Sequence, residues 1–132
     1  MRYLLDTHSL LWALFRPEKL SAPARKEIRD QSNDVAVSVV AFWEISLKCS
    51  LGKLKFSGVK PEELPGASEQ MGLTILPLAK GEAATFSQLP RLAHKDPFDR
   101  MIIWQAIQQN IILISADREF KAYQKHGLRI HW

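Results

Sequence analysis

The amino-acid sequence predicts an α/β fold, a three-layer α/β/α sandwich in which helices cover both faces of a central parallel sheet. Short apolar segments alternate along the chain with segments whose apolar residues have helical spacing. In these apolar segments, hydrophobic and polar residues do not alternate as they do in half-exposed strands. Continuous apolar residues are typical of parallel strands that are buried on both faces. No internal repeat, low-complexity tract or linker interrupts this pattern, so we expect residues 1–132 to form a single domain.

The first four predicted elements are a strand, two helices and a second strand. Residues 2–6 (RYLLD) form a short apolar run that ends in an acid, and residues 8–15 (HSLLWALF) have helical spacing. Ser21 opens residues 21–33 (SAPARKEIRDQSN), where it can cap a helix that carries its charges on one side. Residues 35–38 (VAVS) are short and rich in valine, which favours a strand.

The middle of the chain continues with two helices and a strand. Residues 39–52 (VVAFWEISLKCSLG) predict a helix closed by Gly52, because glycine readily adopts the left-handed conformation that ends helices. Residues 60–72 (KPEELPGASEQMG) predict a helical segment that Pro65 interrupts. Residues 73–78 (LTILPL) predict a strand that is stopped by its proline.

The last five predicted elements continue the alternation. Residues 80–90 (KGEAATFSQLP) and residues 97–110 (PFDRMIIWQAIQQN) predict helices. Residues 111–116 (IILISA) predict a plain buried strand. Residues 117–127 (DREFKAYQKHG) predict a helix that ends at a glycine, and residues 128–132 (LRIHW) predict a final strand.

Composition indicates a globular protein without a membrane-spanning segment. The chain is 46% hydrophobic and 24% charged, and no apolar run approaches the roughly 20 residues that a membrane span needs. Asp6 and His8 interrupt the apolar start of the chain, and no small-residue cleavage site of a signal peptide follows. The single cysteine, Cys49, excludes an internal disulfide and fits a reducing cytoplasm, where we expect the protein to act.

The chain is basic, with a net charge of +4 and a pI of about 9.4. A basic surface attracts phosphate groups at long range, so this charge is compatible with a polyanionic partner. The basic residues concentrate modestly in residues 48–60 (KCSLGKLKFSGVK) and 91–100 (RLAHKDPFDR). The simplest interpretation of each run is a solvated face.

Several acids fall where a parallel sheet binds its ligands, beyond the carboxyl ends of the strands. Asp6 is the last residue of the first predicted strand, and Asp117 lies just past the end of residues 111–116. Taken singly, Asp6 could be a turn acid, and Asp117 is explained as the cap of the helix that follows it.

Two further acids lie at the start of one predicted helix. Pro97 suits the first helical position, so Asp96 is the natural cap of this helix. Asp99 in the first turn also favours the helix dipole. Helical spacing from Asp99, however, runs to Ile102 and Ile103, which belong to the stripe expected to face the sheet. A cap does not require an acid on the buried side of its helix.

Glu44 shows the same anomaly. Its helical neighbours are Val40, Leu47 and Leu51, an apolar row that contains one carboxylate. The alternative is a surface ion pair with Lys48 in the next turn, which is typically worth only ~0.3–0.5 kcal/mol. The spacing alone leaves both interpretations open.

Considered together, these acids predict a metal site. The set consists of Asp6, Glu44, Asp99 and Asp117. Like charges in a partly buried site repel one another, which raises their pKa values unless a cation neutralises them. Hard divalent cations prefer oxygen ligands, and the set has no Cys/His cluster of the zinc type. We therefore expect Mg²⁺, for which Mn²⁺ can substitute. Two such ions roughly 3.5–4 Å apart are a common apparatus for phosphodiester hydrolysis.

Four motifs with these acids also carry a resemblance to a known family. They are LLDTH, SVVAFWEISLKCSLGKL, DPFDRMIIWQA and LISADREF, and together they span essentially the whole chain. In this order and at these spacings, they resemble a PIN domain of the VapC toxin type, the ribonuclease half of a toxin–antitoxin pair. The resemblance implies a PIN-like sandwich and a Mg²⁺-dependent endoribonuclease, which hydrolyses RNA with metal-activated water. By analogy with the two-metal mechanism, we expect hydrolysis to leave a 5′-phosphate and a 3′-hydroxyl.

The resemblance also implies individual roles. Its catalytic, metal-binding carboxylates match Asp6, Glu44, Asp99 and Asp117. Asp96 becomes an accessory residue, a helix cap that can also contact metal-bound water. Thr7 and Ser115 resemble the hydroxyl residues of the family that orient a carboxylate or a water. Trp104 stands where the family usually carries a smaller apolar residue, which bears on packing and not on the metal site.

Partners follow from the same resemblance. We expect an RNA substrate, a homodimer, and a small VapB-like antitoxin that pushes a basic side chain into the acidic pocket. The protein is expected to reach DNA only indirectly, through the DNA-binding half of the antitoxin. No membrane partner is expected.

A few other residues have weaker interpretations. His94 lies in a loop where a phosphate contact is conceivable, and Arg100 points away from its neighbour Asp99, where it could contact the RNA backbone. The large aromatic residues interpreted as core or dimer-interface residues are Trp12, Trp43, Trp104 and Phe42.

Two other functions fit parts of the sequence. A domain that transfers phosphate through an aspartyl phosphate would use a strand-end acid such as Asp6. The chain, however, has no adjacent acid pair and no D-x-D motif, and Glu44 would be unexplained. A catalytically degenerate PIN-like scaffold for RNA or protein would be signalled by loss of one or more acids, yet all four are present. Metal-dependent RNA cleavage that EDTA abolishes separates the nuclease from both.

Overall fold

The computed structural model describes residues 1–132 and contains one five-stranded sheet. Its strands are β1 (Arg2–Leu5), β2 (Asp34–Ser38), β3 (Thr74–Leu76), β4 (Ile112–Ile114) and β5 (Arg129–His131). All neighbouring strands are parallel, and their order across the sheet is β3-β2-β1-β4-β5. The parallel α/β sheet predicted from the sequence is confirmed.

The register of the strands brings separate chain segments to the same edge of the sheet. Leu5, the last residue of β1, pairs with Val37 of β2 and with Ile114 of β4. Asp6 and Ser115 follow Leu5 and Ile114 directly, so both residues leave the sheet at its carboxyl edge. Ligands of open parallel sheets bind at this edge.

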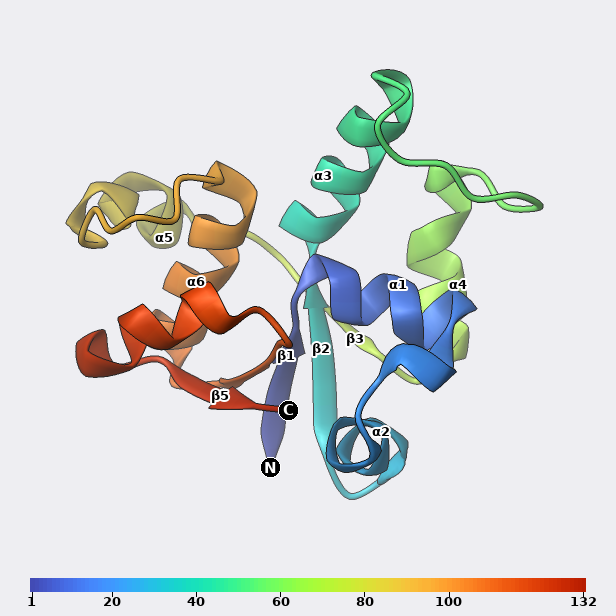
Figure 1. Cartoon of the computed structure of the whole chain (residues 1–132), viewed down its shortest axis with the longest axis horizontal. Helices are drawn as coiled ribbons and strands as arrows, with labels where there is room; N and C mark the ends of the chain where they lie inside the picture. Colours follow the sequence, from blue (N-terminus) through green and yellow to red (C-terminus); the bar gives the residue numbers. More distant parts are fainter.

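Helices cover both faces of the sheet. They are α1 (Thr7–Phe15), α2 (Ala22–Arg29), α3 (Val39–Ser50), α4 (Leu64–Gln70), α5 (Lys80–Thr85) and α6 (Pro97–Gln109). The 3₁₀ segments are Pro17–Lys19, Pro61–Glu63, Phe86–Gln88 and Arg118–His126. Figure 1 shows α1, α2 and α4 on one side of the strands, α5 and α6 on the other, and α3 rising beyond the end of β2. None of the helices combines the length and the apolar character that crossing a membrane requires.

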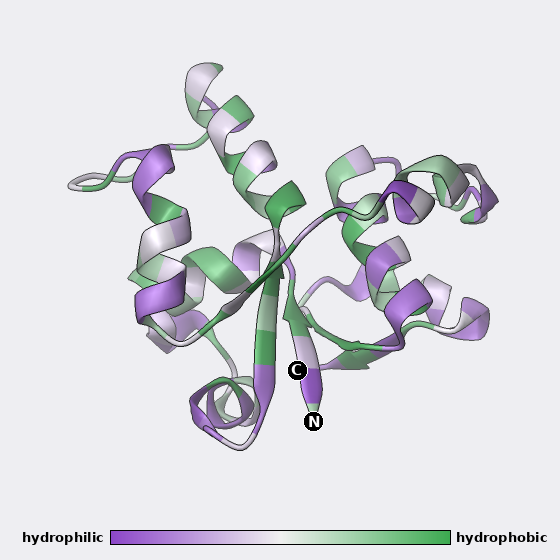
Figure 2. Ribbon diagram, turned by 180° about the vertical axis from the view of Figure 1, so that it is seen from behind, coloured by the Kyte–Doolittle hydropathy of each residue, from purple (hydrophilic) through white to green (hydrophobic).

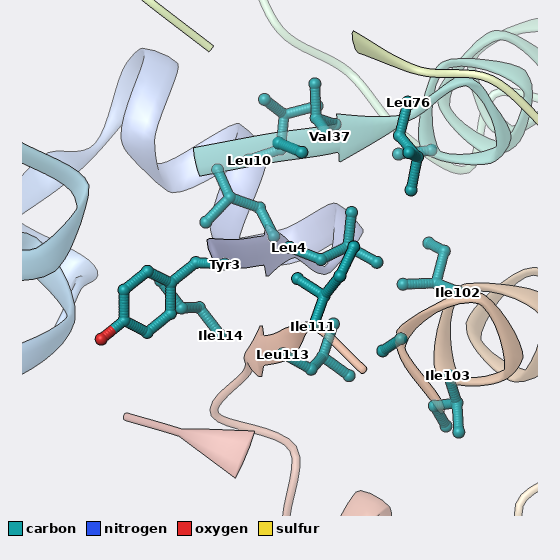
Figure 3. Packing of buried hydrophobic residues seen from close by; sticks show 14 of the residues in the cluster. Tyr3, Leu4, Leu10, Val37, Leu76, Ile102, Ile103, Ile111, Leu113 and Ile114 are labelled. Carbon is teal, nitrogen blue, oxygen red and sulfur yellow. The ribbon is translucent and has the colours of Figure 1, made fainter. Parts of the chain in front are cut away.

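A cluster of 27 buried apolar residues packs the strands against the helices. Leu4 of β1, Leu113 of β4 and Ile102 of α6 belong to this cluster and have no exposed surface (Figure 3). Figure 2 shows the central strands coloured as hydrophobic along most of their length, with hydrophilic residues at their amino ends. Burial on both faces explains why the strand sequences are continuously apolar.

Side-chain caps determine where the helices at the carboxyl edge begin. Asp6 caps α1, Ser38 caps α3 and Asp96 caps α6, each by accepting a hydrogen bond from a backbone N–H of the first turn. Asp96 accepts two such bonds, from Phe98 at 2.8 Å and from Asp99 at 3.2 Å. The predicted capping role of Asp96 is confirmed.

Several details differ from the sequence prediction. Pro65 does not interrupt a helix but lies in the first turn of α4, where its fixed φ and missing N–H are tolerated. Residues 118–126 form a 3₁₀ segment and not an α-helix. Its buried residues, Phe120 and Tyr123, are three apart, so three residues per turn place both against the core. The fourth strand ends early, at Ile114, because the chain turns toward the carboxyl edge after it.

A buried side-chain amide connects α6 to the start of α3. Gln105 has no exposed surface, and its Oε1 accepts a hydrogen bond of 2.6 Å from the Ser38 hydroxyl. Its Nε2 donates to the carbonyl of Pro77 at 3.2 Å and to Glu82 Oε1 at 3.1 Å. Both polar atoms of the amide are therefore satisfied while they hold three segments together.

Replacing Gln105 by Ala should lower the free energy of unfolding by about 1–3 kcal/mol, because Ser38 and Glu82 would lose buried hydrogen-bond partners. Urea denaturation followed by circular dichroism measures this change. Gln108→Ala, on the exposed side of the same helix, is the matched control and should stay within about 0.5 kcal/mol of the original chain. Equal stability of the two variants would contradict the prediction.

Candidate metal centre

Three carboxylates from two helices face one another beyond the carboxyl edge of the sheet. Glu44 lies in the second turn of α3, while Asp96 and Asp99 lie at the start of α6. One oxygen from each of these residues lies within 4.8 Å of the other two, which is close enough to share a cation. Glu44 is only 2% exposed, whereas Asp96 and Asp99 are half-buried.

Asp6 directly follows β1, and each oxygen of its carboxylate accepts a hydrogen bond. Its Oδ1 accepts a hydrogen bond of 2.8 Å from the Ser9 N–H, and its Oδ2 accepts one of 2.6 Å from the Ser115 hydroxyl. Burial raises the pKa of Asp6, although these hydrogen bonds act to lower it. The negative charge of Asp6 also helps to raise the pKa of Asp99.

Glu44 is bound by a hydroxyl and by an ammonium group. Its Oε1 accepts a hydrogen bond of 2.6 Å from the Thr7 hydroxyl, and its Oε2 pairs with Lys48 Nζ. The ion pair that the sequence offered as an alternative is therefore present, but Glu44 is buried and the pair is not a surface bridge. Lys48 Nζ also lies 3.8 Å from Asp96 Oδ2. Burial acts to lower the pKa of Lys48, but the bond to Glu44 and the surrounding acids raise it overall.

Asp99 shows how much negative charge gathers here. Its pKa is raised from the ordinary 3.8 to about 6, first by burial and then by the charges of Asp96 and Glu44. The hydrogen bond between Asp99 Oδ2 and His94 Nε2, at 3.0 Å, acts to lower that pKa. The carboxylates are thus only partly compensated by the groups around them.

Asp117 lies in a neighbouring group with His94 and Glu119. One ligand atom from each of these three residues lies within 4.8 Å of the other two. The ring of His94 bridges this group to Asp99, because its Nδ1 lies 2.5 Å from Glu119 Oε2 while its Nε2 contacts Asp99. The two acidic groups are therefore adjacent and joined through one imidazole.

Ser115 forms a second connection between the two groups. Its hydroxyl donates to Asp6 and accepts a hydrogen bond of 3.1 Å from the N–H of Asp117. Asp117 also caps the 3₁₀ segment that follows it. The structure therefore brings Glu44 and Asp99 into one group, with Asp6 held close by, and places Asp117 in the adjoining group.

Sequence reasoning missed Glu119 and the bridging position of His94. The sequence suggested only a phosphate contact for His94, and the bridge to Glu119 spans 25 residues of chain. No periodicity relates an irregular loop to the 3₁₀ segment that it contacts. The only local signal was the position of Glu119 two residues after Asp117.

The donor set fits a hard divalent cation. The first group offers carboxylate oxygens alone, the second adds one imidazole nitrogen, and neither contains a cysteine. The pKa of Asp99 is raised by burial and also by the charges of Asp96, Glu44 and Asp6, so negative charge here is in excess. A cation with oxygen ligands relieves this repulsion, as Mg²⁺ or Mn²⁺ would.

Comparison with known proteins places this arrangement in a family. The family model for the PIN domain matches residues 3–126. The chain belongs to the PIN domain family. Ribonuclease VapC22 of Mycobacterium tuberculosis (strain ATCC 25618 / H37Rv) is 25% identical over 121 residues, which is 92% of this chain and 91% of that protein. The resemblance to VapC proteins that the motifs indicated is confirmed.

Solved structures share the fold of this PIN domain. One of them is the crystal structure of VapBC2 from Rickettsia felis bound to a DNA fragment from the VapBC2 promoter. It matches with a TM-score of 0.68 and 17% identity over 99% of this chain and 98% of that chain. FitAcB from Neisseria gonorrhoeae matches with a TM-score of 0.62 and 23% identity over 98% of this chain and 96% of that chain. The predicted PIN-like sandwich is therefore confirmed.

A basic hollow lies beside the acids of this PIN domain. It has a volume of about 370 Å³ and is lined by Arg91, Leu92, His94, Lys95 and Arg100. The guanidinium of Arg100, which the sequence suggested for the RNA backbone, donates instead to the carbonyls of Leu89 and Pro90 at 3.1 and 3.3 Å. It also lies 4.9 Å from the centre of the Phe86 ring. In this structure Arg100 holds the preceding loop against α6.

Replacing Asp99 by Asn should stabilise the ion-free protein at neutral pH. The substitution removes a negative charge that burial and neighbouring acids disfavour. We therefore expect the free energy of unfolding at pH 7 to rise by an amount on the order of 2 kcal/mol, a figure reduced to allow for partial exposure. The folded-state pKa of about 6 lies above the ordinary 3.8, so the folded chain binds more protons between these values. The gain should therefore be complete above about pH 6 and vanish as the pH falls toward 4.

Denaturation in EDTA at a series of pH values between 4 and 7 measures this difference. Glu62→Gln, which removes an exposed acid, should change stability little at any of these pH values. Equal stability of the original chain and the Asp99→Asn variant at pH 7 would show that the surroundings of Asp99 do not disfavour its negative charge.

Proposed function

We propose that this PIN domain is a Mg²⁺-dependent endoribonuclease, active also with Mn²⁺, that acts as the toxin of a toxin–antitoxin pair. The observation that carries this proposal is the convergence of Asp6, Glu44 and Asp99 at the carboxyl edge, with Asp117 in the adjoining group. The similarity to a protein named ribonuclease VapC22 supports RNA as the substrate. The whole chain, residues 1–132, would act as a single nuclease domain in the cytoplasm.

Each residue of the site has a physical role in this proposal. The residues that would hold the ions are Asp6, Glu44, Asp99 and Asp117. When bound, the ions would supply a water of lowered pKa and would neutralise charge on the phosphodiester. Attack of water on phosphorus with departure of the 3′ oxygen would leave a 5′-phosphate and a 3′-hydroxyl. Thr7 and Ser115 each donate a hydrogen bond to one acid and so fix its orientation. Asp96 caps the turn that carries Asp99.

A VapB-like antitoxin is the protein partner that we propose, with DNA contacted only through it. The similar structure from Rickettsia felis is a VapBC2 complex on a promoter fragment. The acidic group of this chain already pairs with the side chain of Lys48. A basic side chain of an antitoxin would be attracted to the same carboxylates and would inhibit the nuclease by occupying them.

The geometry disfavours the aspartyl-phosphate alternative. A phosphate acceptor needs a single reactive carboxylate, which leaves the grouping of Glu44 with Asp96 and Asp99 unexplained. A binding scaffold without catalysis would have no need to keep several repelling acids together. The nuclease is therefore the function that the arrangement supports best.

We also propose that the protein forms a homodimer through an exposed apolar row on α3. The row consists of residues four apart, Val39, Trp43, Leu47 and Leu51. Trp43 is 62% exposed and contacts Phe98 edge-on at 4.9 Å. The sequence placed Leu47 and Leu51 on the buried side of this helix, but α3 extends beyond the sheet and leaves both exposed. Such a row is typical of a protein contact surface.

Asp99→Asn should remove RNA cleavage and toxicity on expression while leaving the fold intact. Cleavage of total RNA by the purified chain should also stop in EDTA and return with Mg²⁺ or Mn²⁺. Mapping the product ends should reveal 5′-phosphates. Glu62→Gln serves as the charge-matched control and should cleave normally. An Asp99→Asn protein that still cleaves RNA would overturn the assignment.

Trp43→Glu should convert the homodimer to a monomer, because it places a charge in the centre of the apolar row. Size-exclusion chromatography with light scattering measures the mass of the particle. Met71→Glu, at an exposed apolar residue outside the row, should leave the mass unchanged. A dimer that survives the Trp43 substitution would exclude this surface.

A further inference from the structure

A groove with an aromatic floor runs beside α1. It has a volume of about 750 Å³, within the roughly 300–1,000 Å³ range of small-ligand pockets. Trp12 and Phe15 of α1 line it on one side, and Leu54 and Phe56 of the loop after α3 line it on the other. The rings of Phe15 and Phe56 stack with their centres 5.1 Å apart. Each ring thus covers one face of the other, and both residues remain partly exposed.

The rim of this groove is basic. Arg16, Lys19 and Lys55 line it and are exposed, and no acidic residue is among its lining residues. In the loop after α3, Leu54 and Phe56 pack against the core while Lys55 between them stays exposed. The basic run that looked like a solvated face in the sequence therefore forms one wall of a groove. Cations over an aromatic floor suit a ligand that carries both phosphate and flat rings.

The groove adjoins a second hollow that reaches the metal centre. This hollow of about 280 Å³ shares His8, Leu11 and Leu54 with the groove. The same hollow is lined by Thr7 and Glu44 of the metal centre. A strand whose phosphodiester lies at the carboxylates could therefore pass over His8 and enter the groove.

We propose that this groove is a subsite for single-stranded RNA, which stacks a base flanking the cleaved bond on the aromatic floor and binds the adjoining phosphates at the basic rim. This inference rests on the proposed nuclease function, because the RNA strand is placed with its cleaved bond at the metal centre and its flanking nucleotides in the groove. An exclusively basic rim favours a nucleic acid over an acidic or apolar peptide, since phosphates occur at every nucleotide. The aromatic floor accepts any base, because every base has a stacking face.

Binding without cleavage provides the first test. The Asp99→Asn chain is titrated in metal-free buffer against a fluorescent single-stranded RNA of about 12 nucleotides, and anisotropy gives the dissociation constant. Adding Arg16→Glu with Lys55→Glu should weaken binding by about tenfold or more and lower the salt dependence by roughly one to two ions. Lys121→Glu with Lys125→Glu, an equal charge change on the exposed 3₁₀ segment, should leave the dissociation constant within about twofold.

Stacking is tested at Phe56 in the same background. Phe56→Leu keeps an apolar side chain but removes the ring, and it should weaken binding by about fivefold or more. Phe56→Trp keeps a stacking surface and should restore the affinity. Melting temperatures of both variants show whether either substitution disturbs the fold. Equal affinity of the Leu and Trp variants would exclude a stacked base.

The possible outcomes separate this inference from the proposed function. Groove variants that bind and cleave RNA like the original chain would overturn the subsite and leave the nuclease in place. RNA binding that depends on the groove, in a chain that never cleaves RNA with any divalent ion, would support the subsite and overturn the nuclease. Unchanged RNA affinity together with loss of binding to the purified cognate antitoxin would assign the groove to protein docking and overturn the subsite.

Discussion

Asp6 and Glu44 carry their carboxylates into the protein with 4% and 2% of their surface exposed, and most features of the site compensate for that burial. A carboxylate without water needs donors of its own. Ser115 and Thr7 supply hydroxyl donors, and Lys48 adds a positive charge at Glu44. The pKa of Asp6 nevertheless stays raised by burial. A bound divalent ion would complete the compensation that the protein groups begin, so the same burial that opposes folding of the ion-free chain would favour ion binding.

The parallel sheet makes this concentration of charge possible. Aligned strand ends bring Asp6 and Ser115 together although more than a hundred residues of chain separate them. The helices that carry Glu44 and Asp99 pack against each other above the same edge. The apolar cluster beneath them supplies the main hydrophobic stabilisation of the fold. Burial of these acids opposes folding, and the apolar core outside the site offsets that cost.

Features that recur at a regular spacing in the sequence could be predicted, whereas features that depend on irregular loops could not. The sheet and its covering helices were predictable because burial on two faces produces continuous apolar strands. Glu44 and Asp99 were recognisable because each interrupts an apolar helical pattern. Asp117 was expected with them, yet it lies in the adjoining group with His94 and Glu119. That group depends on the path of an irregular loop, and loops carry no spacing rule from which contacts across 25 residues can be predicted.

The hydrogen bond between Ser38 and Gln105 has a consequence for the distance between the acids. Glu44 lies six residues after Ser38 along α3, and Asp99 lies six residues before Gln105 along α6. At a rise of ~1.5 Å per residue, each acid stands about 9 Å from the same buried contact. The two helices thus share a buried, uncharged contact that lies the same number of residues from each acid, and this contact helps to position both carboxylates.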